Sequence, residues 1–330
     1  MMYKPLLIFT FFFLLNGCTK KTSQEPFWIY TSLYPHVVQE VTTLLKKKFP
    51  DVDFKWYQAG SENVAAKVNA ELLSGKTQAS LLLTSDPFWY EDLKKRDVLL
   101  AYETLKTKDL SNHFKDPHGF YAVCRFPVMV IGYNSDTNLP LPNSFADLTK
   151  PIYKDKLAMP NPLESGTAFT AVALLSKKLG WDYFRKLRGN GILVSGGNSA
   201  VLGRIETKER PIGIVLLENI LQAAEKNPKI KAQYPEDGVV LIPSPIAIVK
   251  TTPNKELAQK VYDFFFEHEA QKAIVKSKMY SPFVQIPPPL QAKPFLEIIQ
   301  NALPWNSNIL EAIYNDREEI KKQFFKTVLE

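Results

Sequence analysis

The chain has 330 residues, and 41 Lys and Arg against 34 Asp and Glu give it a formal net charge of +7. Hydrophobic residues make up 45% of it, and 21 Phe, 14 Tyr and 5 Trp can fill a large core, which excludes a disordered chain. The two Cys permit at most one disulfide, which excludes a disulfide scaffold. The length predicts two domains. The excess of basic residues raises the question of whether the protein binds nucleic acid or a membrane.

The N-terminal sequence predicts that the protein is exported from the cytoplasm. The apolar run from Leu6 to Leu15 is too short to span a bilayer, which takes about 20 residues. It follows Lys4, as the apolar region of a signal peptide follows a positively charged one. The next residues, Leu15-Asn16-Gly17-Cys18, resemble a bacterial lipobox, which implies a diacylglycerol on Cys18 and cleavage before it. We therefore predict a signal peptide at 1–17 and a lipid-anchored tether at 18–26. The alternative is an uncleaved anchor, or a plain signal peptide with a chance cysteine.

The first part of the chain alternates strands and helices. Apolar residues between 37 and 49 recur with helical spacing, whereas 51–57 alternates apolar and polar residues. The run Ser80 to Thr84 holds three consecutive Leu, as in a parallel strand covered on both faces. Strands are predicted at 27–30, 51–57 and 80–84, and helices at 37–49, at 60–73 and from residue 86 or 87, after which 99–102 leads out.

Two long apolar runs, 121–133 and 238–249, frame a second set of elements. Each run is predicted as one long strand, and Cys124 is expected to be a small core residue in the first. Between and after them, strands are predicted at 157–159, 192–194 and 212–217, and helices at 165–179, 181–187, 198–205, 218–226, 255–276, 290–303 and from 307 to the end.

This order predicts an α/β fold of two lobes joined by two crossings. The first lobe would hold 27–125 plus 245–330, and the second would hold 126–244. Each lobe would be a mixed sheet flanked by helices, and the sequence shows no repeat that would indicate a solenoid.

Small hydroxyl residues and Gly recur where predicted strands lead into helices. Helix starts expose unpaired N–H groups and a partial positive charge, so several such turns at one cleft can bind an anion without a metal. In open α/β sheets these turns lie at the carboxyl ends of the strands. Each turn taken alone could equally be an ordinary helix cap. The turns are Thr31-Ser32, Gly60-Ser61, Thr84-Ser85, Ser165-Gly166-Thr167 and Gly196 to Ser199.

Motifs for other chemistry do not occur in the sequence. It has no HExxH or CxxC, its four His lack metal-ligand spacing, and it has no GxxxxGK[ST] loop or GxSxG elbow. The basic runs 46–48 and 94–96 end amphipathic helices without interleaved aromatic residues, which disfavours nucleic acid. We expect no enzyme activity, no cofactor and no metal.

Several stretches together resemble the extracellular solute-binding proteins of ABC importers, in the class that includes ferric-ion, aminoethylphosphonate and hexose-phosphate binders. The resemblance covers nearly all of the predicted mature chain, and its most specific stretch is 141–162 followed by Ser165-Gly166-Thr167. The other stretches are 28–32, 60–71, 211–215, 242–249 and 266–271.

The resemblance implies a type II periplasmic-binding-protein fold whose lobes close on a ligand by a hinge motion. It also implies delivery of the ligand to a membrane permease driven by a separate ATPase. The protein would act as a monomer in the cell envelope, periplasmic or otherwise outside the cytoplasm, held to a membrane by the lipid on Cys18. Nucleic acid is then excluded as a partner.

The resemblance also narrows the class of solute that the protein is expected to bind. Ferric binders carry adjacent Tyr ligands just after the late strand, where this chain has Glu218-Asn219, and an early His ligand of some of them falls near Tyr34. The hydroxyl and glycine turns instead favour a small anion, a phosphorylated sugar or a phosphonate. Glu218 would accept a hydrogen bond from a sugar hydroxyl or an amine. The predicted ligand-binding residues are Ser165, Gly166, Thr167, Gly197, Asn198 and Ser199 from the second lobe, and Thr31, Ser32, Gly60, Ser61 and Ser85 from the first.

Three other functions stay open at this point: a ferric-iron receptor, a lipid-anchored hydrolase on the same scaffold, and a surface adhesin without a small ligand. A hydrolase would need an activated nucleophile, which no motif signals.

Overall fold

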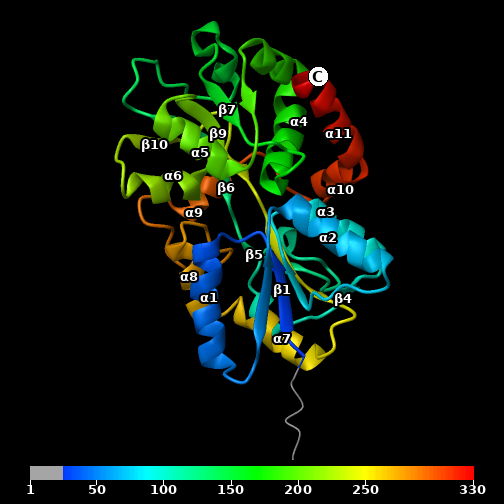
Figure 1. Cartoon of the computed structure of the whole chain (residues 1–330). Coiled ribbons are helices and arrows are strands. Elements are labelled where there is room, and N and C mark those ends of the chain that lie inside the picture. The colour runs from blue at the N-terminus through cyan, green and yellow to red at the C-terminus, as the bar shows by residue number, and fades with distance from the viewer. Residues whose placement is uncertain (1–24) are drawn as a thin grey trace, which may run out of the picture.

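The computed structural model describes residues 25–330, so the predicted signal peptide and Cys18 lie outside the described residues. Two separate sheets, each flanked by helices, form two lobes stacked one above the other (Figure 1). This arrangement confirms the predicted two-lobed α/β fold. We call the part built on the first sheet lobe 1 and the part built on the second sheet lobe 2.

The first sheet has the strand order β2-β1-β3-β12-β4, with β5 paired to β12. The strands β1, β2 and β3 run parallel, so their carboxyl ends meet at the edge that faces lobe 2. Its strands are β1 (Phe27–Thr31), β2 (Phe54–Gln58), β3 (Leu81–Leu83), β4 (Leu99–Leu100), β5 (Ala122–Arg125) and β12 (Ser244–Val249). Its helices are α1 (Pro35–Lys48), α2 (Ser61–Leu73), α3 (Pro87–Lys95), α7 (Lys255–Phe264) and α8 (His268–Lys276).

The second sheet has the order β10-β6-β9-β7-β8, with β11 paired to β6. Its strands are β6 (Val128–Asn134), β7 (Leu157–Met159), β8 (Leu193–Val194), β9 (Ile212–Leu216), β10 (Ile230–Gln233) and β11 (Val240–Leu241). Its helices are α4 (Gly166–Gly189), α5 (Asn198–Thr207) and α6 (Leu217–Ala224). Gly180, at a φ of 74°, breaks α4 between the two helices predicted there. Short helical turns lie at Leu105–Thr107, Asn112–Phe114, Ala146–Thr149 and Pro151–Tyr153, and a last turn at Phe325–Leu329.

The two long predicted strands are wrong as single elements, because each divides between the sheets. The run 121–133 gives β5 to the first sheet and β6 to the second, and 238–249 gives β11 to the second and β12 to the first. Between β5 and β6, the Phe126 N–H donates instead to the Tyr280 carbonyl at 2.9 Å. A long apolar run shows that the chain is buried but not where it changes sheets.

Three further elements differ from expectation. The strand β10 had not been predicted, and the helix expected over 255–276 is two helices, α7 and α8. In place of the helix expected over 290–303, a shorter α9 spans Phe295–Gln300.

The C-terminal helices divide between the lobes: α10 (Ser307–Asn315) packs on α3 of lobe 1, and α11 (Arg317–Phe324) packs on α4 of lobe 2. Ile313, Ile320 and Phe324 share one buried cluster with residues of α4 and with Phe88 of α3, so this part of 245–330 does not lie in lobe 1 alone as predicted. The apolar stripe of an amphipathic helix predicts that the helix packs, but not against which lobe. The rest of the predicted division into lobes stays a prediction.

Candidate functional site

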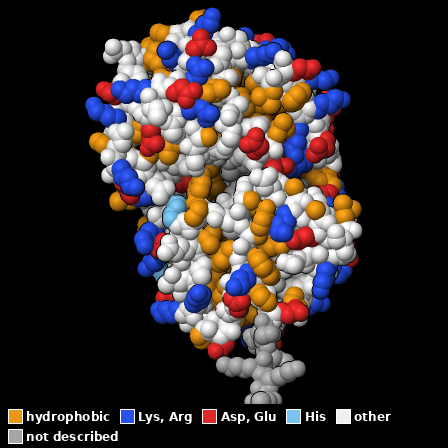
Figure 2. All heavy atoms as spheres, viewed as in Figure 1, with side chains coloured by type: hydrophobic (Ala, Val, Ile, Leu, Met, Phe, Trp, Pro, Cys, Tyr) orange, Lys and Arg blue, Asp and Glu red, His pale blue; other side chains and the backbone are white. Residues whose placement is uncertain are grey.

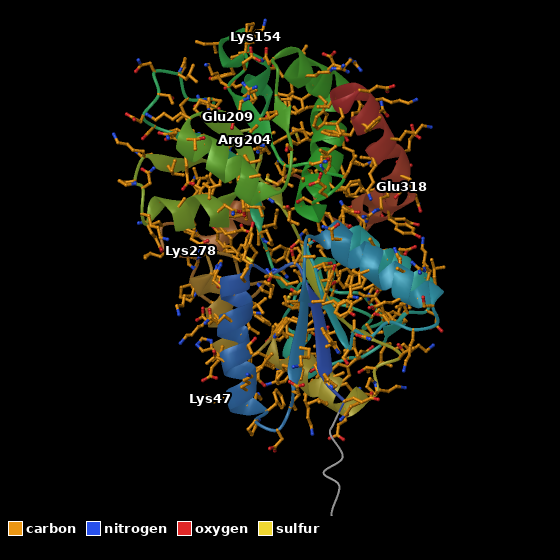
Figure 3. All side chains as sticks on the ribbon, viewed as in Figure 1. Lys47, Lys154, Arg204, Glu209, Lys278 and Glu318 are labelled. Atoms are coloured by element: carbon orange, nitrogen blue, oxygen red, sulfur yellow. The ribbon has the colours of Figure 1, made fainter. Side chains whose placement is uncertain are left out.

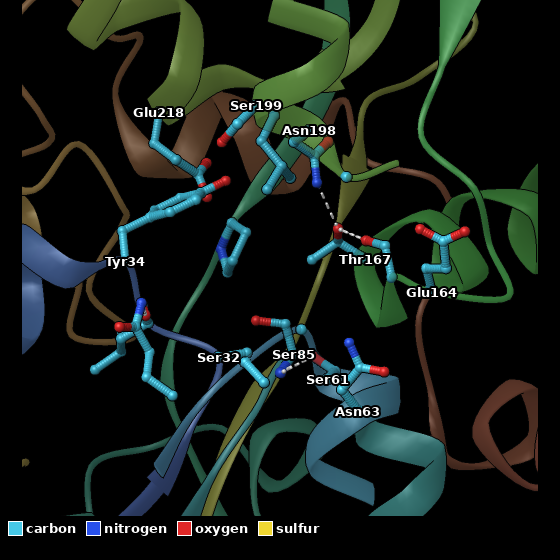
Figure 4. A pocket seen from close by; sticks show the side chains of 18 of the residues that line it. Ser32, Tyr34, Ser61, Asn63, Ser85, Glu164, Thr167, Asn198, Ser199 and Glu218 are labelled. Carbon is cyan, nitrogen blue, oxygen red and sulfur yellow. Dashed lines mark hydrogen bonds between the residues drawn. The ribbon is translucent and has the colours of Figure 1, made fainter. Parts of the chain in front are cut away.

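A cavity of about 360 Å³ lies between the two lobes, where the carboxyl ends of the strands meet the starts of several helices. Figure 2 shows the molecule hollowed between its two halves, and Figure 4 shows the side chains around the cavity. The residues that cap the starts of α1, α2, α4 and α5 line it: Tyr34, Gly60, Ser165 and Gly197.

The structure brings together residues from all five of the turns singled out in the sequence. From lobe 1, Ser32, Gly60, Ser61 and Ser85 line the cavity. From lobe 2, Ser165, Thr167, Gly197, Asn198, Ser199 and Glu218 line it. Their roles toward a ligand remain predictions, but their convergence on one cavity is the geometry that an anion site requires.

Thr31 is one of two predicted residues that lie outside the lining. It is fully buried, and its Oγ1 donates to the Leu83 carbonyl at 2.9 Å and accepts from the Leu33 N–H at 3.0 Å. Both hydrogen-bonding roles of the hydroxyl are therefore filled inside lobe 1. A hydroxyl next to a ligand turn looks the same in sequence whether it faces the ligand or secures the turn.

Gly166 is the other residue outside the lining. It begins α4 and faces lobe 1, where a Cβ at this position would lie 2.8 Å from the Asp86 Cβ and the Ser85 carbonyl oxygen and 2.9 Å from the Ser61 Cβ. Atoms do not approach that closely without something shifting. Glycine therefore lets the two lobes meet directly beside the cavity.

Arg125 lines the cavity and was not predicted. It ends β5, its residue exposure is 1%, and its Nη2 donates to the Ser85 Oγ at 3.0 Å and to the Ser32 Oγ at 3.4 Å. Its Nε and Nη1 have no hydrogen-bond partner among the described residues. A buried cation with free donors is costly unless something pairs with it. The signal in the sequence was one arginine inside the apolar run 121–133.

Glu218, in the first turn of α6, is the second buried charged group of the cavity. It is 4% exposed, and its Oε2 has no partner among the described residues. Burial raises the pKa of the Glu218 carboxyl to about 8, although the nearby charge of Arg125 acts in the opposite direction. At neutral pH the carboxyl is therefore mostly protonated, and Arg125 is left as the uncompensated buried charge.

Tyr34 brings α1 against α6 across the cleft. Its hydroxyl donates to the Asn219 Oδ1 at 2.9 Å, and its side chain also lines the cavity (Figure 4). Burial, and next the proximity of Glu218, raise the pKa of the phenol, which keeps it neutral.

The hydroxyls of lobe 2 form a chain along the upper wall of the cavity. The Thr167 Oγ1 accepts from the Asn198 Nδ2 at 3.0 Å and lies 2.9 Å from the Ser165 Oγ, which in turn caps α4 by accepting from the Ala168 N–H (Figure 4). The chain fixes these side chains before any ligand arrives.

Several other features lie away from the cavity or carry no site. Among residues 25–330, no group of three or more His, Cys, Asp or Glu side chains is placed to hold a metal ion. Within the same range, no helix is long and apolar enough to cross a membrane. Arg204 does not line the cavity, and its Nε lies 3.8 Å from the Glu209 Oε2 (Figure 3). Cys124 is a buried core residue, as predicted.

Comparisons with known proteins give matches in sequence and in fold. A family model described as bacterial extracellular solute-binding protein matches residues 77–304. An uncharacterized protein of Haemophilus influenzae is 21% identical over 258 residues, which cover 74% of this chain and 73% of that protein.

Two solved structures share the fold. The first is the periplasmic binding protein AfuA from Actinobacillus pleuropneumoniae, with exogenous fructose-6-phosphate bound. It has a TM-score of 0.81 at 20% identity and covers 92% of this chain and 98% of its own. The second is iron-bound HitA from Pseudomonas aeruginosa, with a TM-score of 0.80 at 17% identity and coverage of 91% and 99%.

Proposed function

Since this chain belongs to the family of bacterial extracellular solute-binding proteins, we propose that it is the substrate-binding component of an ABC importer. In this proposal it captures a small anionic solute between its lobes and delivers the solute to a permease that a separate ATPase drives. It works as a monomer, and the lipid on Cys18 holds it near that permease.

Arg125 is the observation that carries the choice of an anion. Its unpartnered Nε and Nη1 are the donors that a phosphoryl or phosphonate oxygen would satisfy. The protonated Glu218 leaves that positive charge uncancelled, and a neutral carboxyl does not repel an anion. The exposed Glu164 at the edge of the cavity is the other acidic residue of the lining.

A phosphorylated sugar or a phosphonate fits the remaining lining. Ser32, Ser61 and Ser85 would donate from below, and the hydroxyl chain of lobe 2 from above, to the oxygens of one phosphoryl group. Glu218 would bind a hydroxyl or an amine at the other end of the solute. The bound fructose-6-phosphate of AfuA supports this class, because that protein shares the fold over nearly its whole length.

Calorimetry on a protein spanning residues 19–330 tests the proposal. The panel contains fructose-6-phosphate, an aminoalkyl phosphonate, the same sugar without its phosphate, and ferric citrate. We expect saturable binding of a phosphorylated or phosphonate compound and none of the matched neutral sugar.

Two results would replace the proposal. Tight ferric binding with a tyrosinate charge-transfer band would establish the iron receptor instead. Hydrolysis of a phosphoester, lost in Ser165→Ala, would establish the hydrolase. A melting temperature that no compound on the panel raises would contradict solute capture.

A further inference from the structure

The C-terminal helices α10 and α11, which we call the strap (residues 307–324), lie beside the cavity on one side of the molecule. In Figure 1 they descend from the level of α4 in lobe 2 to the level of α3 and α2 in lobe 1. The packing agrees, because α10 contacts α3 and α11 contacts α4. The proposed solute capture does not use these helices.

Apolar contacts attach α11 to lobe 2. Ile320 and Phe324 are buried in the cluster that also holds Phe169 of α4. The Arg317 guanidinium lies 5.0 Å from the centre of the Phe169 ring, and the Lys321 Nζ lies 5.6 Å from it. When the lobes separate, α11 is therefore expected to move with lobe 2.

The charged ends of the same two side chains reach lobe 1. The Arg317 Nη2 lies 2.7 Å from the Glu62 Oε1 and 2.6 Å from the Asp86 Oδ2, and the Lys321 Nζ lies 2.9 Å from the Glu62 Oε2. The side chains of the four residues are between 1% and 17% exposed. Ion pairs that are this well buried respond to the loss of one partner far more strongly than surface pairs do.

The two acceptors sit at the ligand turns themselves. Glu62 stands between Ser61 and Asn63, both of which line the cavity, and Asp86 follows Ser85, which also lines it. Glu62 lies in the first turn of α2, and the Asp86 Oδ1 caps α3 by accepting from the Trp89 N–H at 3.2 Å. The ion pairs therefore tie lobe 2 to the two helix starts of lobe 1 that face the cavity.

We propose that Arg317 and Lys321 are positioning residues that hold the two lobes closed beside the cavity, so that the strap sets how often the empty protein opens. Opening the lobes must separate both side chains from Glu62 and Asp86. The proposal rests on the two-lobed capture described above but not on the identity of the solute. Because the attraction is ionic, added salt should weaken it where the pairs reach solvent.

Energy transfer between two dyes in the solute-free protein tests this inference. Lys47→Cys in lobe 1 and Lys154→Cys in lobe 2 place the dyes at exposed sites at opposite ends of the molecule (Figure 3). A protein spanning residues 19–330 lacks Cys18 and keeps every element of the described structure, and its one native thiol, Cys124, is buried.

Arg317→Ala is compared with Lys322→Ala, which removes a charge from the same helix. Lys322 is exposed, and its nearest acidic partner is Glu319 of its own helix, at 3.9 Å. We expect Arg317→Ala, which removes the pairs with both Glu62 and Asp86, to raise the ratio of open to closed molecules about a hundredfold or more, the order of magnitude for losing one partner of a buried ion pair. Lys321→Ala should act in the same direction, and Arg317→Lys should restore part of the closed population. Lys322→Ala should leave the ratio unchanged.

Equal dye distances in Arg317→Ala, Lys321→Ala and Lys322→Ala would overturn the inference. If Arg317→Ala does not fold, as circular dichroism would show, Glu62→Gln removes the acceptor's charge with little change of shape and must open the lobes instead. No solute enters the experiment, so a panel of solutes that fails to bind contradicts the proposed function and leaves this result intact.

Discussion

Glu218→Gln tests the electrostatics of the cavity through the stability of the empty protein. The carboxyl is buried without a partner for its Oε2, and its pKa rises from 4.5 to about 8 on folding. Each unit of pKa is worth about 1.4 kcal/mol, so the charged form costs the folded state about 5 kcal/mol.

The direction follows from which state holds the proton. Between pH 4.5 and pH 8 the folded protein keeps the proton on Glu218, whereas the unfolded chain has lost it. The contribution of Glu218 to the free energy of unfolding is therefore highest at acid pH and falls as the pH rises from 4.5 to 8. Glutamine has no proton to lose. Relative to the natural protein, the variant should gain about 1.4 kcal/mol for each pH unit between pH 5 and pH 8.

Urea unfolding of both proteins at pH 5, 6, 7, 8 and 9 measures this difference. Other titrating groups are shared and cancel in the comparison. Glu164→Gln, which changes an exposed glutamate at the edge of the same cavity, is measured in parallel as the control for the substitution itself. A Glu218→Gln profile parallel to that of the natural protein would refute the buried, protonated carboxyl.

Three further substitutions test the cavity. Arg125→Gln should weaken binding of a phosphorylated solute about 100-fold by calorimetry, since charge-assisted hydrogen bonds contribute about 1.5–3 kcal/mol each, and should leave the melting temperature unchanged or higher. Unchanged affinity would mean that the anion binds elsewhere. Gly166→Ala places a Cβ 2.8 Å from Asp86, so small-angle scattering should show a more open molecule; an unchanged radius of gyration would contradict this. Tyr34→Phe removes the hydrogen bond to Asn219 across the cleft. It should lower the free energy of unfolding in urea by about 1 kcal/mol, and a loss below about 0.3 kcal/mol would contradict a formed hydrogen bond.

Much of the site could be predicted because its turns carry local signals. Small hydroxyl residues and glycines at helix starts are visible in sequence, and the fold gathers such turns at the carboxyl ends of its strands. Thr31 and Gly166 show the limit of that reasoning. Each has the right residue type in the right turn, yet one faces the interior of lobe 1 and the other faces the opposite lobe.

Arg125 could not be assigned from its neighbours in sequence. An arginine in an apolar run is either an edge residue or a buried cation, and its role depends on Ser32 and Ser85, which lie in the turns after two other strands. The pKa of Glu218 is set in the same way, because burial is a property of the packed molecule rather than of a helix start.

The sequence by itself determined the alternation of strands and helices, the two changeover regions and the turns that cap the cavity, because these depend on the periodicity and capping preferences of neighbouring residues. Only the tertiary structure decided where the long apolar runs change sheets and which lobe the C-terminal helices join. It alone placed Arg125 at the cavity and the Arg317 ion pairs beside it, because Arg125 and Ser85 are 40 residues apart along the chain and Arg317 and Glu62 are 255 apart.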